Sequence, residues 1–552
     1  MEIHLVSDFN IELLGRYLKA ESSLPECSPV VAPYGQVIQS LNRQTAVTPE
    51  SFGLVWTRPE GVLSSFSRVL EGERIDSADL FAEVADFAEQ LRRAAGQYKV
   101  LFVANWVRSA RERGLGMLDW SQDGHAYLLA KMNVLLADAV RSTSNIYLLD
   151  VDRWIEAAQP DARDPKYWFA MKTPFTEGVF QAAARDIKAA VRANLGLSRK
   201  VIAVDLDNTL WGGVVGDDGW ENLNLGGHDH LGEAYVEFQK ALKRLTRRGV
   251  QVVLVSKNDE ATALTAIDNH PGMVLRREDI AGWRINWNDK ARNIVELAQE
   301  LNLGLQSFIF IDDNPAERGR VREALPDVFV PEWPKSPTKY AEALRLLDCF
   351  DQLSITAEDR ARTQMYVQER NRKQDAVKFS SVEEWLDSLD IRVAVAPVKG
   401  SNIKRVVQLL NKTNQMNLAG RRLVEKELND WIAAKAGREI YALSVADRFG
   451  DLGLTGVVSW ESQGQSLSIV DFVLSCRAMG RKVENTMIYL ASNAARTTRA
   501  NEIVARAIPT RRNGPCLDFW RHCGFSEVEP NVFQWNSGAI YPKPDCVNIK
   551  VD

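Results

Sequence analysis

The feature that most constrains the fold is a run of four apolar residues leading directly into two alternate aspartates, Val201-Ile-Ala-Val-Asp205-Leu-Asp207-Asn-Thr209-Leu210. A continuous Val/Ile/Leu run is typical of a buried parallel strand, and parallel sheets place their chemistry just beyond the carboxyl ends of the strands. Side chains alternate along a strand, so Asp205 and Asp207 share one site only if the backbone turns at once. Such close carboxylates repel each other unless a cation lies between them. The run therefore predicts a parallel α/β sheet whose edge holds Mg²⁺ and a phosphate group.

Further polar groups follow at later predicted strand or helix ends. They are Ser256 and Lys257 after Val250–Val255, Lys290 at the start of Ala291–Leu301, and Asp312 and Asp313 after Phe308–Ile311. A hydroxyl such as that of Ser256, followed by backbone N–H groups, can hold phosphate oxygens. Lys290 can neutralise a phosphoryl group and nearby carboxylates. Asp312 and Asp313 offer further oxygen ligands for a hard metal ion.

In this order, the four segments resemble the signatures of the haloacid dehalogenase (HAD) superfamily of phosphotransferases. The resemblance implies that Asp205 is a nucleophile that forms an aspartyl-phosphate and that Asp207 is the general acid/base. It implies Mg²⁺ held by Asp205, Asp312 and the backbone carbonyl of Asp207, with Asp313 as a further ligand. The implied phosphate-binding residues are Thr209, Ser256, Lys257 and Lys290. A single strand-end aspartate is more often a helix N-cap, but four such features in order favour the catalytic interpretation.

The composition fits a multidomain enzyme of the cytoplasm. A chain of 552 residues is too long for one hydrophobic core. The net charge of −5 argues against nucleic-acid binding, and no apolar run is long enough to span a membrane. The N-terminal sequence lacks the features of a signal peptide, and the six cysteines show no metal-ligand spacing, so we expect reduced thiols.

Residues 1–195 are predicted to form a parallel sheet, because short apolar strands alternate with helical patterns. The expected strands are Ile3–Val6, Phe52–Trp56, Lys99–Ala104 and Asn145–Val151, and the expected helices are Ala78–Ala95 and Gly124–Ser142. The segment resembles the three-layer SGNH-hydrolase fold, with Ser7 near the usual nucleophile and Asn105 near the usual oxyanion-hole position. The histidine expected after Asp164 is missing, so Ser7 lacks a base. A recognition or docking module is therefore a better interpretation than an esterase.

Residues 196–340 form the predicted HAD-like domain. The glycine-rich segment Trp211–Gly219 can form a flap or a structural hairpin beside the site. The distances between the signatures leave no room for an inserted cap domain, so we expect a mouth open to a bulky partner. Residues 341–388 are predicted to be a helical connector whose many charges form a solvated face.

Residues 389–552 are predicted to form a mixed sheet that resembles the acetyltransferase (GNAT) class of acyl-CoA transferases. Expected strands are Ile391–Val395, Glu439–Leu443, Val457–Trp460, Leu467–Val470 and Phe472–Leu474, with helices over 402–410, from Arg477 toward Ala491, and near Leu517. The pyrophosphate-loop pattern of that class, Arg/Gln-x-x-Gly-x-Gly/Ala, is met at Arg477 and Gly480, but Lys482 replaces the final small residue. A bulky side chain there obstructs close backbone approach. CoA binding is thus in doubt, whereas a phosphopantetheine arm, which lacks the diphosphate bridge, remains compatible.

Three further segments make the resemblance more specific: Asn411–Asn417, Asp447–Gly453 and Ser475–Arg481. With the Asp205 signature, they resemble the FkbH-like family of glyceryl transferase/phosphatases, over residues 199–533. The resemblance implies that a phosphorylated three-carbon substrate, D-1,3-bisphosphoglycerate, is captured as a thioester and dephosphorylated. The glyceryl group then passes to an acyl-carrier protein for polyketide-type biosynthesis.

Cys476 is our candidate thiol, because it lies in a matching segment beside Arg477 and just before a predicted helix N-terminus. Both features favour a thiolate. The alternatives are a buried structural cysteine, or Cys523 as the thiol. The residues assigned to the acyl site are Asn411, Asn414, Asn417, Asp447 and Arg477; turn and cap roles are the alternative for the polar ones.

Two other functions remain open at this stage. One is a HAD-type small-molecule phosphatase whose flanking domains are inert. The other is a non-catalytic scaffold that docks carrier proteins. Such a scaffold has no need for five convergent polar groups, which here are Asp205, Asp207, Ser256, Lys290 and Asp312.

Overall fold

The computed structural model describes residues 1–23, 25–42, 48, 50–108, 112–227, 229–353, 355, 364, 368, 372, 375, 378–434 and 437–551. The chain forms two compact units, Met1–Arg192 with Val424–Glu427, and Ala193–Leu423 with Leu428–Asp552. The finer division at 195, 340 and 388 stays a prediction. Within the expected helical connector, residues 341–388, most of the stretch 354–377 lies outside the described residues.

The first unit contains a parallel five-stranded sheet in the order β2-β1-β3-β4-β5, as counted over the described residues. Its strands are β1 (Glu2–Val6), β2 (Ser28–Val31), β3 (Phe52–Val55), β4 (Val100–Ala104) and β5 (Ile146–Leu149). Its helices are α1 (Glu12–Ala20), α2 (Val37–Asn42), α3 (Pro59–Val62), α4 (Ser64–Leu70), α5 (Ser77–Ala95), α6 (His125–Val140), α7 (Val151–Ala157), α8 (Pro165–Met171) and α9 (Glu177–Asn194). Every residue of β3 and β4 is buried, so both faces of the sheet are covered, as the α/β prediction requires.

The second unit begins with a parallel sheet in the order β8-β7-β6-β9. The strands are β6 (Val201–Val204), β7 (Gln251–Ser256), β8 (Ile280–Ile285) and β9 (Phe308–Ile311). The helices around it are α10 (Val215–Asp218), α11 (His230–Thr246), α12 (Glu260–Asn269), α13 (Lys290–Glu300), α14 (Pro315–Ala324) and α15 (Tyr340–Arg345).

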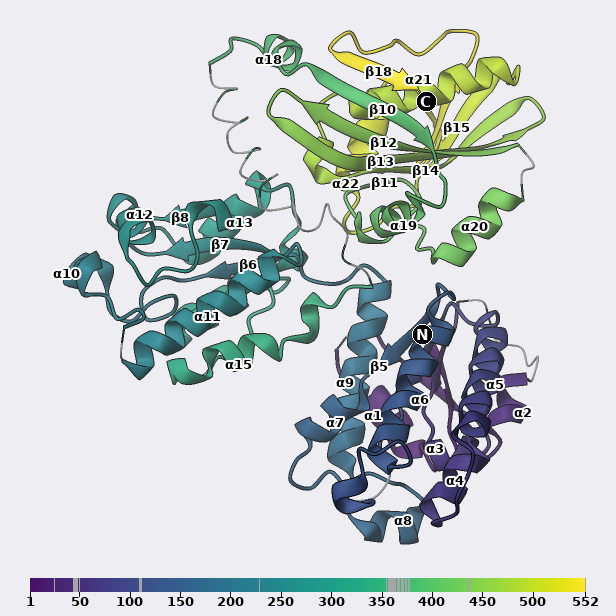
Figure 1. Cartoon of the computed structure of the whole chain (residues 1–552). Helices are drawn as coiled ribbons and strands as arrows, with labels where there is room; N and C mark the ends of the chain where they lie inside the picture. Colours follow the sequence, from purple (N-terminus) through teal and green to yellow (C-terminus); the bar gives the residue numbers. More distant parts are fainter. Residues whose placement is uncertain are drawn as a thin grey trace. The chain divides into compact units, whose positions relative to one another are not determined.

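Alternate residues of β6 explain how this sheet is covered on both faces. Ile202 and Val204 pack into a core shared with α11, α12 and α15, whereas Val201 and Ala203 pack against α13 and α14. Figure 1 shows the sheet between these helices, with α11 and α15 on one side and α13 on the other. The chain between the signature residues forms α10 to α13 and β8, which leaves no cap domain among its described residues.

A nine-stranded mixed sheet completes the second unit, in the order β16-β17-β15-β14-β13-β12-β10-β18 with β11 paired to β14, again over the described residues. Its strands are β10 (Ile391–Pro397), β11 (Met416–Asn417), β12 (Arg438–Asp447), β13 (Gly450–Gln463), β14 (Ser466–Leu474), β15 (Glu502–Arg506), β16 (Ser526–Glu529), β17 (Val532–Asn536) and β18 (Val547–Val551). Its helices are α18 (Val382–Ser388), α19 (Ile403–Lys412), α20 (Glu425–Ala433), α21 (Val483–Thr497) and α22 (Gly514–His522).

Within this sheet β14 and β15 run parallel, whereas β12, β13 and β14 are antiparallel neighbours. The two predicted segments Leu467–Val470 and Phe472–Leu474 are one strand, β14. The helix expected from Arg477 begins only at Val483. Within the part of the chain that the structure describes, no helix combines the length and the apolar character needed to cross a membrane.

Candidate active site

The parallel pairing of β6 with β9 brings two signature aspartates together. Val204 pairs with Ile311 in register, so Asp205 and Asp312 leave neighbouring strands at the same edge of the sheet. The chain then turns at once, with Asn208 in the left-handed region at φ 54°, which is the turn that the sequence pattern requires. Asp205 and Asp312 are 5% and 0% exposed.

Lys290 lies between these two carboxylates. Its Nζ is 2.8 Å from Asp205 Oδ1 and 2.7 Å from Asp312 Oδ2. The N-cap residue Asp289 starts α13 by accepting the Ala291 and Arg292 N–H groups, and so places Lys290 at the first helical position. Burial lowers the pKa of the Lys290 ammonium, but the two carboxylates outweigh burial and hold that pKa above its ordinary value. Lys290 is therefore a buried fixed cation.

Three carboxylates at this edge can hold a divalent cation. Asp205, Asp312 and Asp313 each offer an oxygen, and these oxygens lie within 4.8 Å of one another. Octahedral Mg²⁺ with oxygens at about 2.1 Å needs ligands about 3–4 Å apart, so the donor set fits the ion with small adjustments. Burial, followed by the charge of Asp205, raises the pKa of Asp312 to about 6. The same two causes raise the pKa of Asp313. A cation would relieve this repulsion.

Asp207 has a different surrounding, in which three donors hold its carboxylate. Its Oδ1 accepts the Trp211 indole N–H at 3.0 Å and the Val215 backbone N–H at 3.1 Å. Its Oδ2 accepts the Asn258 amide at 2.7 Å. Burial raises the pKa of Asp207, the neighbouring Asp205 adds to the rise, and the three hydrogen bonds oppose it. The carboxyl group is thus fixed in direction and kept separate from the Lys290 ion pairs, as a proton-transfer group requires.

Two of these donors belong to the glycine-rich flap. Gly212 and Asn224 form an isolated antiparallel bridge, and α10 lies between them. The segment 211–224 is therefore a closed loop whose first residue, Trp211, is completely buried. The sequence pattern predicted the flap but not the roles of Trp211 and Asn258, because both depend on how distant segments meet.

Of the predicted phosphate-binding residues, Ser256 and Thr209 lie at the end of the sheet that carries the aspartates, whereas Lys257 is bound to a glutamate. Ser256 is buried at the end of β7, at the same end of the parallel sheet as Asp205. The Thr209 hydroxyl donates to Asp313 Oδ1 at 3.3 Å and accepts the Asp313 N–H at 3.0 Å, so it orients a carboxylate. Lys257 instead donates to Glu317 Oε1 at 2.6 Å, with its side chain 39% exposed. We refer to Asp205, Asp207, Lys290, Asp312 and Asp313 as the aspartate site.

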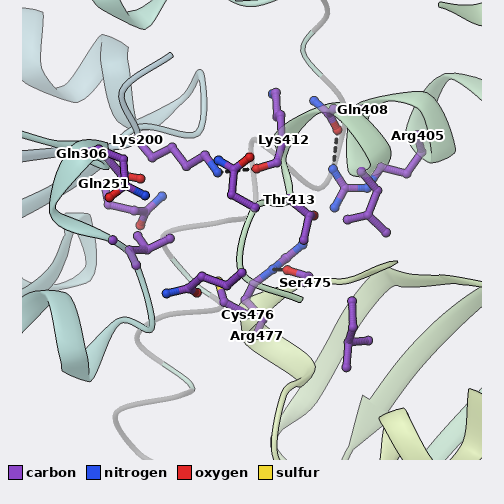
Figure 2. Close-up of a pocket in the computed structure, with 17 residues that line it drawn as sticks. Lys200, Gln251, Gln306, Arg405, Gln408, Lys412, Thr413, Ser475, Cys476 and Arg477 are labelled. Atoms are coloured by element: carbon purple, nitrogen blue, oxygen red, sulfur yellow. Dashed lines mark hydrogen bonds between the residues drawn. The ribbon is translucent and has the colours of Figure 1, made fainter. Parts of the chain in front are cut away.

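Cys476 lies in a second location, a pocket of about 70 Å³. One wall consists of Lys200, Gln251 and Gln306, and Figure 2 shows Cys476 and Arg477 with Thr413 on the other side. The lining residues are Lys200, Gln251, Leu303, Gly304, Gln306, Ser307, Arg405, Gln408, Leu409, Lys412, Thr413, Asn414, Gln415, Leu474, Ser475, Cys476 and Arg477. We call this cavity the Cys476 pocket.

The Cys476 pocket and the aspartate site lie at opposite edges of one sheet. Lys200 directly precedes β6 and Gln251 begins β7, whereas Asp205 follows the last residue of β6. Five residues of parallel strand, at about 3.3 Å each, separate Lys200 from Asp205 by about 16 Å. A small group bound covalently at Cys476 is therefore remote from Asp205.

The setting of Cys476 differs in one respect from the prediction. The residue lies in a short 3₁₀ turn, Cys476–Ala478, and α21 starts seven residues later at Val483. Cys476 is therefore not in the first turn of α21 or at its N-cap, the positions where the dipole effect is strongest. Arg477, which is 7% exposed, remains beside it. Burial raises the pKa of the alternative thiol Cys523 to about 11, which disfavours a thiolate there.

The other predicted acyl-site residues hold the local backbone. Asn411 donates to the Leu423 carbonyl and accepts the Leu423 N–H. Asn417 accepts the Gly420 N–H and donates to the Thr413 carbonyl. These are the turn roles that we left open as an alternative. Asn414 lines the Cys476 pocket, where its side-chain oxygen accepts from Arg422.

Asp447 forms a buried ion pair. Both of its oxygens accept from Arg372, at 2.7 and 2.8 Å, and both side chains are 0% exposed. Asp447 also accepts the N–H groups of Phe449 and Gly450. A carboxylate committed to a bidentate arginine and two amides is an anchor for its turn, because releasing it would leave a buried charge.

The serine of the N-terminal sheet is also surrounded by structural contacts. Ser7 Oγ accepts the Phe9 N–H at 3.1 Å. Next to it, Asp8 accepts the backbone and side-chain N–H groups of Arg58, and the Arg58 guanidinium stacks on Trp168 at 4.2 Å. Asn105 accepts the Val151 N–H at 2.7 Å. An arginine and a tryptophan thus occupy the region where the sequence lacks a catalytic histidine.

Neither a protein-family model nor a curated protein sequence matches the chain. Among solved structures, the chain is similar to the N-terminal part of the protein BF1531 from Bacteroides fragilis, which contains a phosphatase domain and is complexed with Mg. The identity is 28% and the TM-score 0.58, over 64% of this chain and 94% of that chain.

Shorter likenesses involve acetyltransferases. A point mutant of the spermidine N-acetyltransferase SpeG from Vibrio cholerae is 14% identical, with a TM-score of 0.20 over 26% of this chain and 94% of that chain. A GNAT-family acetyltransferase from Staphylococcus aureus is 8% identical, with a TM-score of 0.20 over 26% and 99%. At these scores the likenesses carry nothing about function. The phosphatase-domain likeness, together with the intact aspartate site, identifies an enzyme with a HAD-like domain, as the sequence predicts.

Proposed function

We propose that the protein is a bifunctional glyceryl transferase/phosphatase of the FkbH-like type, which acts in the cytoplasm. It captures the glyceryl group of D-1,3-bisphosphoglycerate, loads it onto an acyl-carrier protein for polyketide-type biosynthesis and removes its remaining phosphate. The observation that carries the phosphatase half is the buried cluster of Asp205, Asp312 and Lys290 beside the separately held Asp207. Mg²⁺ is the proposed cofactor, because the three carboxylates fit its ligand spacing and the similar phosphatase domain is complexed with Mg.

In the phosphatase half, Asp205 attacks the phosphorus atom and the ester P–O bond breaks. Asp207 gives its proton to the leaving alkoxide, which becomes the free hydroxyl of the glyceryl group. Asp207 then accepts a proton from the water that attacks the aspartyl-phosphate, and inorganic phosphate leaves. Lys290 neutralises phosphoryl oxygens, and Mg²⁺, when bound, supplies charge that these residues do not.

In the transfer half, the Cys476 thiolate attacks the acyl-phosphate carbonyl, whose C–O bond breaks as phosphate leaves. An acyl phosphate is already activated, so one thiol suffices for capture. The same thioester is then attacked by the pantetheine thiol of the carrier protein, which regenerates Cys476. The separation of the two sites by about 16 Å of strand supports a carrier arm that moves the acyl group between them.

One experiment tests both halves. The full-length protein is incubated with D-1,3-bisphosphoglycerate, Mg²⁺ and a pantetheinylated carrier protein, and every chain is weighed by intact-mass spectrometry. The proposal expects mass on the enzyme in the wild type and in Cys523→Ala, no mass in Cys476→Ala, and glyceryl on the carrier. No acyl mass on any chain would overturn the proposal.

The second candidate is a small-molecule phosphatase with inert flanking domains. The structural roles of Asn411, Asn417 and Asp447 favour it. In that case Cys476→Ala leaves every phosphate-releasing activity unchanged, and the carrier protein remains unloaded.

A further inference from the structure

The loop between β14 and α21 holds a carboxylate from its own chain. Glu484, in the first turn of α21, is 4% exposed. Its Oε1 accepts the backbone N–H of Gly480 at 2.8 Å. Gly480 has φ 74° and Lys482, which immediately precedes α21, has φ 60°. The Glu484 side chain thus reaches back from the first turn of α21 to the loop that precedes it.

This loop is the segment that matches the pyrophosphate-loop pattern of acyl-CoA transferases at Arg477 and Gly480. A loop of that kind binds a diphosphate through backbone N–H groups and the positive end of the helix dipole. Here the N–H of Gly480 is already donated to a buried side-chain oxygen from the first turn of that helix. A diphosphate would have to displace this buried side chain before it could reach the Gly480 donor.

We infer that Glu484 closes this loop to diphosphate ligands, so that the C-terminal sheet takes its acyl acceptor as a bare pantetheine thiol and gains nothing from a nucleotide. This inference rests on the proposed function for the identity of the acceptor. The closure of the loop itself does not depend on it. Lys482 adds a side chain at the same turn, but the carboxylate of Glu484 is the group that occupies the donor.

Binding to the full-length protein is measured by isothermal titration with CoA and with pantetheine, in the absence of any acyl donor. We expect a CoA Kd weaker than about 1 mM, and no heat from ADP. A CoA Kd tighter than about 0.1 mM, at least tenfold tighter than that of pantetheine, would overturn the inference. Because no acyl donor is present, this result is separate from the fate of the glyceryl-transfer proposal.

Two variants of one position sharpen the test. Glu484→Ala removes the side chain, and we expect CoA binding to strengthen at least about tenfold while pantetheine binding is unchanged. Glu484→Gln keeps an oxygen of the same reach, and we expect it to stay closed. A folded Glu484→Ala protein that gains no affinity, or a Glu484→Gln protein that gains as much, contradicts the role of Glu484. If Glu484→Ala does not fold, the comparison of CoA with pantetheine in the wild type decides.

A kinetic measurement applies the inference to turnover. With pantetheine and CoA as small-molecule acyl acceptors, the kcat/KM values should agree within about threefold. An advantage of CoA of more than tenfold would show that the nucleotide is bound and would overturn the inference.

Discussion

The aspartate site and the Cys476 region use their polar side chains in opposite ways. In the aspartate site, Asp205, Lys290 and Asp312 meet one another in a buried cluster at the sheet edge. In the motifs assigned to the acyl site, Asn411 bonds to backbone groups, and Asp447 is committed to Arg372 and to the amides of its own turn. A motif match of the same strength can therefore mark chemistry in one region and loop architecture in another.

The difference follows from where the motifs lie. Side chains that follow buried parallel strands are brought to one edge by the sheet itself, so their convergence needs no further support. The loops after α19 and β12 have no such scaffold, and their amides and carboxylates are used to hold the turns. Any acyl transfer at the Cys476 pocket then depends on the thiol and the residues that line the pocket, and not on Asn411, Asn417 and Asp447.

The largest effect should come from Asp205→Asn. The amide cannot act as the nucleophile, so Mg²⁺-dependent phosphate release should fall by at least about 10³-fold. Capture at Cys476 should persist, so that intact mass without the carrier protein shows the phosphorylated acyl group on the enzyme. Release of the ester phosphate, counted apart from the phosphate that leaves on capture at Cys476, within tenfold of the wild type would contradict the nucleophilic role of Asp205.

The next effect concerns stability. Lys290→Met leaves two buried carboxylates without their cation and should lower the free energy of unfolding of the metal-free protein by about 3–5 kcal/mol. The matched control is Lys257→Met, which removes a partly exposed ion pair with Glu317 and should cost no more than about 1 kcal/mol. Urea denaturation in EDTA measures both. Equal losses in the two variants would contradict the buried role of Lys290.

A smaller effect is expected at the donors of Asp207. Trp211→Phe and Asn258→Ala each remove one hydrogen bond to this carboxylate, worth about 1.5–3 kcal/mol for a charged group. We expect kcat to fall about 10- to 100-fold with KM nearly unchanged, because the donors orient a proton-transfer group and not the substrate. Val214→Ala, in the same flap but with an exposed side chain, is the control. A change confined to KM would contradict this positioning role.

The smallest effect is a pH dependence of the stability of α21, which packs on the C-terminal sheet. Burial raises the pKa of Glu484, so the folded state holds this proton at a pH where the unfolded chain has released it. The contribution of the wild-type residue to stability is complete below the unfolded pKa of about 4.5 and is lost as the pH rises toward the folded value, by no more than about 1.4 kcal/mol per pH unit.

Glu484→Gln removes this titration. We compare the hydrogen-exchange protection of the α21 amides in the two proteins, corrected for the intrinsic exchange rate. The protection in Glu484→Gln should rise relative to that in the wild type as the pH increases from 5 to 8. A constant difference between the two proteins across this range would show that Glu484 does not titrate on unfolding.

Much of the aspartate site was predictable because its signal is local. Asp205, Ser256 and Asp312 directly follow apolar runs, and a parallel sheet places such positions together whatever the rest of the chain does. The strand β8 was missed, because Gly282 and Arg284 interrupt its apolar pattern.

Features that depend on distant segments could not be read from the sequence. The partner of Asp447 is Arg372, 75 residues earlier. The start of α21 was placed too early, because Gly480 and Lys482 at positive φ delay the helix, although the residues after Arg477 have helical character.

The anchoring of Asp207 has a consequence for turnover. Its Oδ1 is held by two groups of the flap, Trp211 and Val215. A displacement of segment 211–224 would therefore change the direction in which the Asp207 carboxyl group points. The conformation of this loop and the proton transfers proposed for Asp207 are thus coupled, so hydrolysis would require the loop to be in place.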